Sequence, residues 1–312
     1  MEDHKGMILD LDSFSTHDGP GIRMTVFLKG CPLRCRWCHS PETQDFRTQL
    51  LYKVMKCRFC FHCIDSCPCH AISQEGGGIV IARGSCVNCG RCEEVCVTKA
   101  LQTGGKVFSP QQIAELAEKD KKFYNNSGGG VTVSGGEPLM QPGFTKELLR
   151  LLNRSGISAI IETCGYGSRQ DLEECLSLCD SVFYDIKIMD SEKHLEYTGK
   201  DNKMILENLE YVCRKEEYAE KITVRTPCIP GINDSEEEIR SIAAFASKCG
   251  VNSMELMPYN VMAPEKYTWI GREYPLADCK LQPAGLYESL NHIIDEFDWK
   301  GRKINDRERN PG

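Results

Sequence analysis

The sequence contains no long hydrophobic run and no excess of positive charge. Nowhere in its 312 residues do about 18 apolar residues stand together, the length that a membrane-spanning helix needs. The first fifteen residues, MEDHKGMILDLDSFS, lack both the basic and the apolar segment of a secretion signal. The formal net charge is -7, so the chain carries no electrostatic footprint for nucleic acid. We therefore expect a cytoplasmic protein that binds neither membranes nor nucleic acid.

Cysteine, in contrast, is abundant, with 19 in the chain. In a reducing compartment this number favours metal or cluster ligation over disulfides. Twelve of the 19 lie between Cys31 and Cys96, and eight of these form two similar runs, CRFCFHCIDSC and CVNCGRCEEVC, which begin 29 residues apart. The seven cysteines beyond Cys96 have no ligand spacing, and we expect them to be small buried side chains.

Each run has the spacing C-x2-C-x2-C-x3-C of two-cluster ferredoxins, in which three thiolates bind one four-iron cluster and the fourth crosses to the other. The spacing predicts two auxiliary clusters, one on Cys57, Cys60, Cys63 and Cys96 and the other on Cys86, Cys89, Cys92 and Cys67. A pair of zinc sites is the alternative, although zinc usually joins two ligand pairs across a longer gap. Cys69 is a free thiol or an alternative to Cys67; Pro68, directly after Cys67, favours the free thiol.

Outside this cysteine-rich segment, short apolar runs alternate with amphipathic ones. We expect strands at 24–30, 130–136, 158–165, 181–189, 221–231 and 252–260, and helices at 109–124, 141–156, 168–179, 202–216 and 234–250. This alternation predicts parallel β/α units, in a barrel or in a doubly wound sheet, with functional sites at the carboxyl ends of the strands. The domains expected are residues 1–49 and 104–312, which form this α/β unit, and residues 50–103, which form a ferredoxin-like insert.

Three further cysteines, Cys31, Cys35 and Cys38 in KGCPLRCRWCH, follow the first predicted strand without a fourth cysteine nearby. A four-iron cluster on three thiolates keeps one iron open, and an open coordination position is typical of a catalytic metal site. The spacing C-x3-C-x2-C, with Trp37 before the last cysteine, resembles the radical S-adenosylmethionine (SAM) superfamily. A structural zinc site with a distant fourth ligand is the alternative.

Other motifs narrow the resemblance. SGGEP at 134–138 is similar to the glycine-rich motif with which that superfamily binds the amino group of SAM. With DGPGIR, CHSPET and DIK in the same order, nearly the whole chain resembles the glycyl radical enzyme activating enzymes, in the branch that carries an inserted two-cluster domain. The resemblance implies a partial (β/α)6 TIM-like barrel with that insert.

The same resemblance implies the site residues. Cys31, Cys35, Cys38 and Lys187 are expected to be catalytic, and Lys187 to be the partner of the SAM carboxylate. The cofactor-binding residues that it implies are Trp37, Gly135, Gly136, Glu137, Glu162, Thr163, Asp185, Lys187, Arg225 and Asn260. A monovalent cation is expected near Asp185. Asn260 stands where family members often have a histidine near the ribose, and an amide can still bond a hydroxyl. A structural ion pair of Asp185 and Lys187, or one that includes Arg225, is the alternative.

The function implied is that of an oxidoreductase of anaerobic metabolism with three four-iron clusters. It cleaves SAM reductively to a 5′-deoxyadenosyl radical, which abstracts hydrogen from the α-carbon of a glycine in a partner glycyl radical enzyme, whose glycine loop enters the mouth of the barrel. Flavodoxin or ferredoxin is the expected electron donor, and a monomer the expected state. Two alternatives stay open. An electron-transfer protein explains only the eight ferredoxin-type cysteines, and a radical SAM enzyme acting on a small molecule or peptide keeps every motif.

Overall fold

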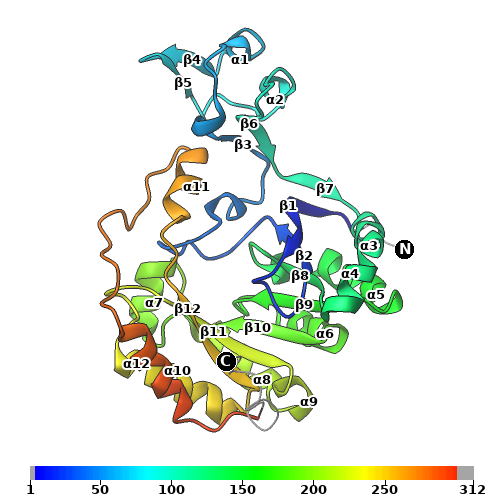
Figure 1. Cartoon of the computed structure of the whole chain (residues 1–312), viewed down its shortest axis with the longest axis vertical. Helices are drawn as coiled ribbons and strands as arrows, with labels where there is room; N and C mark the ends of the chain where they lie inside the picture. Colours follow the sequence, from blue (N-terminus) through cyan, green and yellow to red (C-terminus); the bar gives the residue numbers. More distant parts are fainter. Residues whose placement is uncertain (1–3, 301–312) are drawn as a thin grey trace.

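An eight-stranded sheet in the order β12-β11-β10-β9-β8-β2-β1-β7 organises the chain, whose residues 4–300 are described by a computed structural model (Figure 1). The strands are β1 (Gly6–Ser15), β2 (Arg23–Leu28), β7 (Lys106–Phe108), β8 (Gly130–Gly135), β9 (Ser158–Thr163), β10 (Ser181–Asp185), β11 (Ile222–Cys228) and β12 (Ser253–Pro258). Six of these strands, β2 and β8 to β12, are parallel to one another. All six strands expected from the sequence are therefore confirmed.

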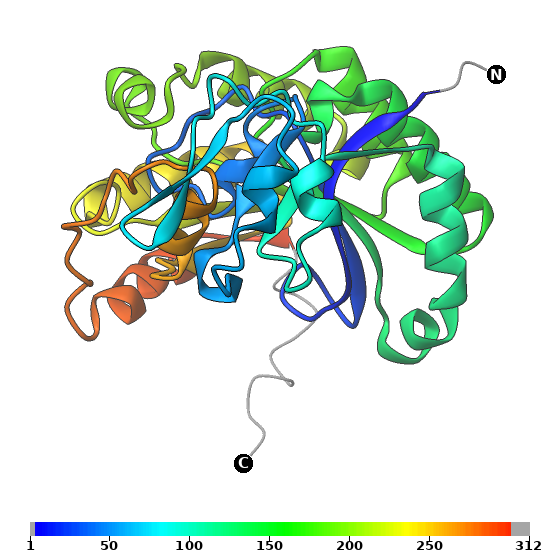
Figure 2. The same ribbon diagram turned by 90° about the horizontal axis from the view of Figure 1, so that it is seen from above.

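The strand order separates a barrel from a doubly wound sheet. A doubly wound sheet reverses its strand order at a switch point, whereas here β2, β8, β9, β10, β11 and β12 follow one another without reversal. Successive right-handed crossovers then place every helix on the same side. Seen from above, the helices follow the outer side of a curved sheet (Figure 2). The α/β fold is thus a partial barrel of six β/α units, as expected.

The connecting helices include the five that the sequence predicted, one of which is split at Asp120. Their bounds are α3 (Pro110–Lys119), α4 (Lys121–Ser127), α5 (Pro142–Arg154), α6 (Arg169–Leu178), α7 (Ser191–Thr198), α8 (Lys203–Val212), α9 (Glu216–Ala219), α10 (Glu236–Cys249), α11 (Ala263–Trp269) and α12 (Leu286–Asp295). Helix α6 shows why they form. Ser168 accepts a hydrogen bond from the Asp171 amide at its N-terminus, and helical spacing directs its apolar residues inward.

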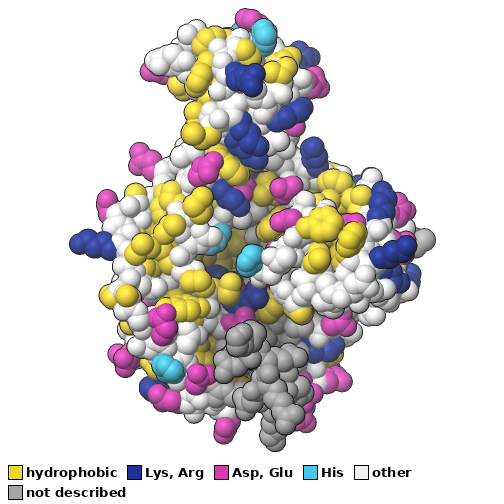
Figure 3. Space-filling model, viewed as in Figure 1, with side chains coloured by type: hydrophobic (Ala, Val, Ile, Leu, Met, Phe, Trp, Pro, Cys, Tyr) yellow, Lys and Arg dark blue, Asp and Glu magenta, His cyan; other side chains and the backbone are white. Residues whose placement is uncertain are grey.

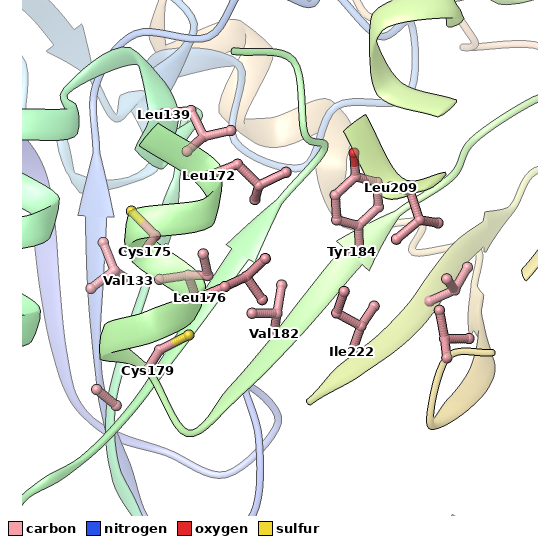
Figure 4. Packing of buried hydrophobic residues seen from close by; sticks show 14 of the residues in the cluster. Val133, Leu139, Leu172, Cys175, Leu176, Cys179, Val182, Tyr184, Leu209 and Ile222 are labelled. Carbon is pink, nitrogen blue, oxygen red and sulfur yellow. The ribbon is translucent and has the colours of Figure 1, made fainter. Parts of the chain in front are cut away.

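The core lies between these helices and the sheet. Figure 4 shows Cys175 of α6, and Cys179 directly after this helix, among buried strand residues that include Val133 and Val182. Both cysteines are almost fully buried, as expected for small apolar side chains. The same expectation is wrong for three other scattered cysteines, which are only half-buried: Cys213, Cys249 and Cys279.

The sequence analysis missed the two antiparallel strands at one edge of the sheet. Strand β1 pairs with β2 on one side and with β7 on the other. The run LDLD within this strand alternates apolar and polar residues, a period-2 signal that could have identified part of β1. Helices α7, α11 and α12 were missed as well.

The cysteine-rich segment projects from the barrel at the top of Figure 1. Its first strand, β3 (Gln49–Tyr52), pairs antiparallel with its last, β6 (Leu101–Gly104), so that the segment leaves and rejoins the barrel at one place. Between them lie η2 (Val54–Lys56), α1 (His62–Asp65), α2 (Arg91–Glu94) and a hairpin of β4 (Ile72–Glu75) and β5 (Gly78–Ile81). The segment has an apolar cluster of its own, separate from the barrel core.

Within residues 4–300, no helix combines the length and the apolar character needed to cross a membrane.

Candidate functional site

A cavity of about 310 Å³ lies at the carboxyl ends of the parallel strands. Figure 3 shows the face below the projecting segment hollowed near its centre. The predicted residues that line this cavity are Cys31, Cys35, Trp37, Cys38, Gly135, Gly136, Glu137, Glu162, Thr163, Asp185, Lys187, Arg225 and Asn260. Every barrel residue that the sequence analysis proposed is therefore brought to one place.

The loop after β2 directs Cys31, Cys35 and Cys38 into this cavity. Burial raises the pKa of all three thiols, that of Cys35 to about 12. Buried thiols of this kind become thiolates when a bound metal centre supplies positive charge. Three sulfurs converging from one short loop therefore fit a cluster that keeps one iron available to a further ligand. Trp37 packs beside them as an apolar wall.

Asp185 and Lys187 lie at and just beyond the end of β10, where they form an ion pair of 2.7 Å. Burial of the Lys187 ammonium opposes its charge, but Asp185 and the nearby thiols outweigh that effect and raise its pKa. Lys187 is thus a fixed cation on the cavity wall. Arg225 is not a partner of this pair.

Arg225 of β11 is instead bound by glutamates of β9 and of the adjacent strand β12. It donates to Glu162 at 2.8 Å and makes a longer contact of 3.4 Å with Glu255. The second carboxylate oxygen of Glu162 accepts a hydrogen bond from Ser134. Burial raises the pKa of Glu162 to about 7, although the hydroxyl of Ser134 and the charge of Arg225 counteract the shift.

The carboxylate of Glu137 forms hydrogen bonds with neighbouring groups of the protein. Its two oxygens accept hydrogen bonds from the Leu139 amide, the Cys164 amide and the Thr163 hydroxyl. Burial raises the pKa of this carboxyl, and the same donors oppose that shift. The side chains of Glu137 and Thr163 thus join the end of β8 to the end of β9.

A glycine is required at position 136 because the backbone of Gly30 lies very close to it. A Cβ there would lie 2.2 Å from the carbonyl oxygen of Gly30, which directly precedes the cysteine loop. The Glu137 amide donates to the same oxygen at 2.8 Å. The sequence analysis attributed the glycines to the approach of a ligand, whereas here Gly136 allows two strand ends to approach each other.

Asn260 lies beyond β12 and lines the cavity. Its side-chain oxygen accepts a hydrogen bond from the Met262 amide at 2.8 Å. An amide has two further N–H donors, so this bond is compatible with a role as a donor to a hydroxyl.

The sequence analysis missed several cavity residues. Cys164, which it grouped with the scattered cysteines, lines the cavity, and so do Asp18, Ser134 and Tyr259. The position of Cys164, directly after Thr163 in ETCG at the end of a predicted strand, was the available signal.

The cysteines of the projecting segment gather in two sets. A small pocket is lined by Cys67, Cys69, Cys86, Cys89 and Cys92. In the other set, burial and the neighbouring thiols of Cys57, Cys60 and Cys96 raise the pKa of Cys63. The structure thus brings together the same crossed sets that the ferredoxin spacing predicted, with Cys69 close to the second set.

The backbone conformation of this segment repeats together with the two cysteine runs. All five non-glycine residues with positive φ among those described lie in this segment: Phe59, Phe61, His70, Asn88 and Lys99. They recur at the interval of the two cysteine runs, since the φ of Phe59 (54°) matches that of Asn88 (53°), and His70 (48°) matches Lys99 (56°). Such strain persists where surrounding structure or a bound group requires it.

Comparison with known proteins identifies the family of this chain. The radical SAM superfamily profile matches residues 25–243. The isethionate sulfite-lyase activating enzyme of Oleidesulfovibrio alaskensis is 44% identical over 301 residues, which cover 94% of this chain and 96% of that protein. The choline trimethylamine-lyase activating enzyme of the same organism is 38% identical, over 96% and 98% of the two chains.

Among solved structures, a radical SAM methyltransferase from Sphaerobacter thermophilus has a TM-score of 0.51 at 12% identity, over 93% of this chain and 74% of that chain, which shows a shared fold alone. The chain therefore belongs to the radical SAM superfamily and, within it, to the glycyl radical enzyme activating enzymes. The resemblance stated from the motifs is confirmed.

Proposed function

We propose that this chain uses the cavity at the carboxyl ends of its strands to activate a glycyl radical enzyme. A cluster on Cys31, Cys35 and Cys38, when bound and reduced, supplies the electron that cleaves SAM to methionine and a 5′-deoxyadenosyl radical, which abstracts hydrogen from the α-carbon of a partner glycine. The observation that carries the proposal is the convergence of three buried thiols, a fixed cation and several hydrogen-bonding groups on one cavity. The names of the relatives support the same role.

Lys187 binds the carboxylate of the methionine part of SAM. Its ammonium is held by Asp185 and lies within electrostatic reach of Cys35. An anionic group placed between the cluster and the lysine would therefore meet a cation whose position is already fixed, which reduces the cost of ordering it on binding.

The remaining barrel residues shape the site. Trp37 excludes water beside the thiols, and Asn260 donates to a ribose hydroxyl. The ion pair of Arg225 and Glu162 forms a polar wall of the cavity. The part of the protein that would face the amino group of SAM is formed by Gly135, Gly136, Glu137 and Thr163. A monovalent cation beside Asp185 remains a prediction.

The segment of residues 50–103 serves as a domain that holds two auxiliary four-iron clusters on the crossed cysteine sets. The spacing C-x2-C-x2-C-x3-C of both runs favours four-iron clusters over zinc, which usually joins two ligand pairs across a longer gap.

The auxiliary clusters relay electrons from an acidic flavodoxin or ferredoxin. Residues 50–103 contain six Lys and Arg against four Asp and Glu, although the whole chain has a net charge of -7. Figure 3 shows dark blue side chains on this projecting part. Cys60 is exposed, and so are Lys56 and Arg58 beside it. This arrangement would attract an acidic donor to the first cluster.

We place the enzyme in the cytoplasm as a monomer. The number of its cysteines supports this placement, because cluster ligation by many thiols suits a reducing compartment.

Electron paramagnetic resonance tests the function. The reconstituted protein, reduced and supplied with SAM, is mixed with isethionate sulfite-lyase or choline trimethylamine-lyase of O. alaskensis, the enzymes that the names of two relatives indicate. We expect a glycyl radical on at least one of them, and deuterium from its α-deuterated glycine in 5′-deoxyadenosine. A partner with the glycine replaced by alanine is the control. The result would count against this function if SAM is cleaved but neither partner carries a radical and the 5′-deoxyadenosine contains no deuterium.

A further inference from the structure

Helix α11 lies between the cluster-bearing insert and the cysteine loop of the barrel. It follows β12 and packs against both η1 (Pro41–Thr43) and β3. Figure 1 shows it below the insert, in orange. The superfamily match ends at residue 243, so this helix lies beyond the part of the chain that the superfamily profile covers.

On the side of the insert, Arg83 ties α11 to β3. It donates from Nη1 to the Leu50 carbonyl at 2.7 Å and from Nη2 to the Trp269 carbonyl at 2.8 Å. The ammonium of Lys53 lies 4.6 Å from the centre of the Trp269 ring. Gly271, with φ +66°, leaves room for the guanidinium, because a Cβ there would lie 2.5 Å from Arg83 Nε.

Arg83 also connects the helix to the second cysteine set. Burial lowers the pKa of Arg83, and the charge of the nearby Cys86 opposes that shift, which places the guanidinium within electrostatic reach of that sulfur. The residue that holds α11 therefore lies beside the second cysteine set.

On the side of the barrel, α11 holds the cysteine loop. The Tyr267 hydroxyl lies 3.5 Å from the Cys35 carbonyl and 3.4 Å from the Arg36 carbonyl, and its ring belongs to an apolar cluster that contacts Cys38. Its neighbour Lys266 forms an ion pair of 3.3 Å with Glu42.

Two further contacts strengthen this side. The Glu42 side chain is only 3% exposed, and one of its oxygens has no hydrogen-bond partner, so Lys266 is its principal counter-charge. Just beyond the helix, Arg272 donates to the Gln44 side chain at 3.1 Å. One short helix thus contacts the loop at several points and the insert at two.

We propose that α11 is a clasp that fixes the insert against the cysteine loop of the barrel, and that Arg83 is its positioning residue. The clasp sets the separation between the auxiliary cluster on Cys67, Cys86, Cys89 and Cys92 and the SAM-binding cluster, and so governs electron delivery between them. The proposal rests on the proposed function, because it assumes that both clusters are present.

Hydrogen–deuterium exchange of the reconstituted protein tests the clasp without reference to catalysis. Arg83→Ala removes two charge-assisted hydrogen bonds, so we expect amides of residues 263–272 to exchange at least about tenfold faster than in the wild type. Arg83→Lys, which can reach one carbonyl, should lie between the two. Arg91→Ala removes an exposed arginine of the insert as a matched control and should leave this exchange unchanged.

A comparison of two reductants tests the consequence for electron delivery. Dithionite is small enough to reduce the barrel cluster directly, whereas reduced flavodoxin is expected to deliver electrons through the insert. Formation of 5′-deoxyadenosine by Arg83→Ala should therefore fall with flavodoxin and stay within about twofold of the wild type with dithionite. Lys53→Met, which removes only the contact with the Trp269 ring, should show a smaller fall.

Unchanged exchange at α11 in Arg83→Ala, or equal rates with both reductants in that variant and the wild type, would overturn the clasp. Failure of the proposed function looks different. Wild-type protein that holds only about four irons would lack the auxiliary clusters, and the exchange comparison would still decide whether α11 clasps the insert.

Discussion

Replacing Gly136 by alanine tests how closely the ends of β8 and β2 approach. The new Cβ would stand 2.2 Å from the Gly30 oxygen and 2.7 Å from its carbonyl carbon. Both are backbone atoms, so the strand end must move by roughly 1 Å, and the bond from the Glu137 amide to the same oxygen must lengthen. Overpacking costs about 1–3 kcal/mol and a weakened hydrogen bond about 1 kcal/mol, which together predict a loss of about 2–4 kcal/mol.

The assay is anaerobic thermal unfolding, with iron content measured on the same samples. For a chain of this size the loss corresponds to a melting temperature lower by roughly 3–6 °C. Because Gly30 directly precedes Cys31, the displaced carbonyl should also reduce loading of the barrel cluster. Gly84→Ala is the matched control, since its Cβ would have nothing within 4 Å. A Gly136→Ala protein that melts within about 2 °C of the wild type and carries its full iron would refute the reasoning.

Three further predictions concern charge and ligation. Lys187→Met removes the cation held by Asp185 and should weaken SAM binding at least about tenfold, measured by calorimetry, while iron content stays constant. The raised pKa of Glu162, about 7 against 4.5 in the unfolded chain, means that the native state holds this proton more tightly. The contribution of this proton to stability is complete below pH 4.5 and is lost as pH rises through 7. Glu162→Gln should therefore flatten the dependence of the unfolding free energy on pH between these values. An unchanged slope would contradict the raised pKa of Glu162. Cys67→Ser should lose about four irons and Cys69→Ser none, and the reverse result in iron analysis would show that Cys69 is the ligand.

Much of the barrel was predictable because its information is local. Each parallel strand is a short apolar run between amphipathic helices, and each motif residue stands at a fixed distance from a strand end. Lys187 and Asn260 reached the cavity for this reason, since carboxyl ends of parallel strands meet at one edge.

What the sequence did not predict depends on contacts between distant segments. The pairing of Arg225 with Glu162 crosses 63 residues, and the contact of Tyr267 with Cys35 crosses 232. The need for glycine at 136 arises from Gly30, far away in the chain. No local pattern encodes such partners. Strand β1 was different, because the alternation of its LDLD run was present in the sequence and was overlooked.

The most direct test of the central claim is iron analysis with product analysis on anaerobically reconstituted, dithionite-reduced protein. The wild type should hold about twelve irons and release 5′-deoxyadenosine and methionine from SAM. The triple variant Cys31→Ala, Cys35→Ala, Cys38→Ala should keep about eight irons and cleave no SAM. Cleavage by the triple variant, or about eight irons with no cleavage in the wild type, would contradict the assignment of these three cysteines to a catalytic cluster.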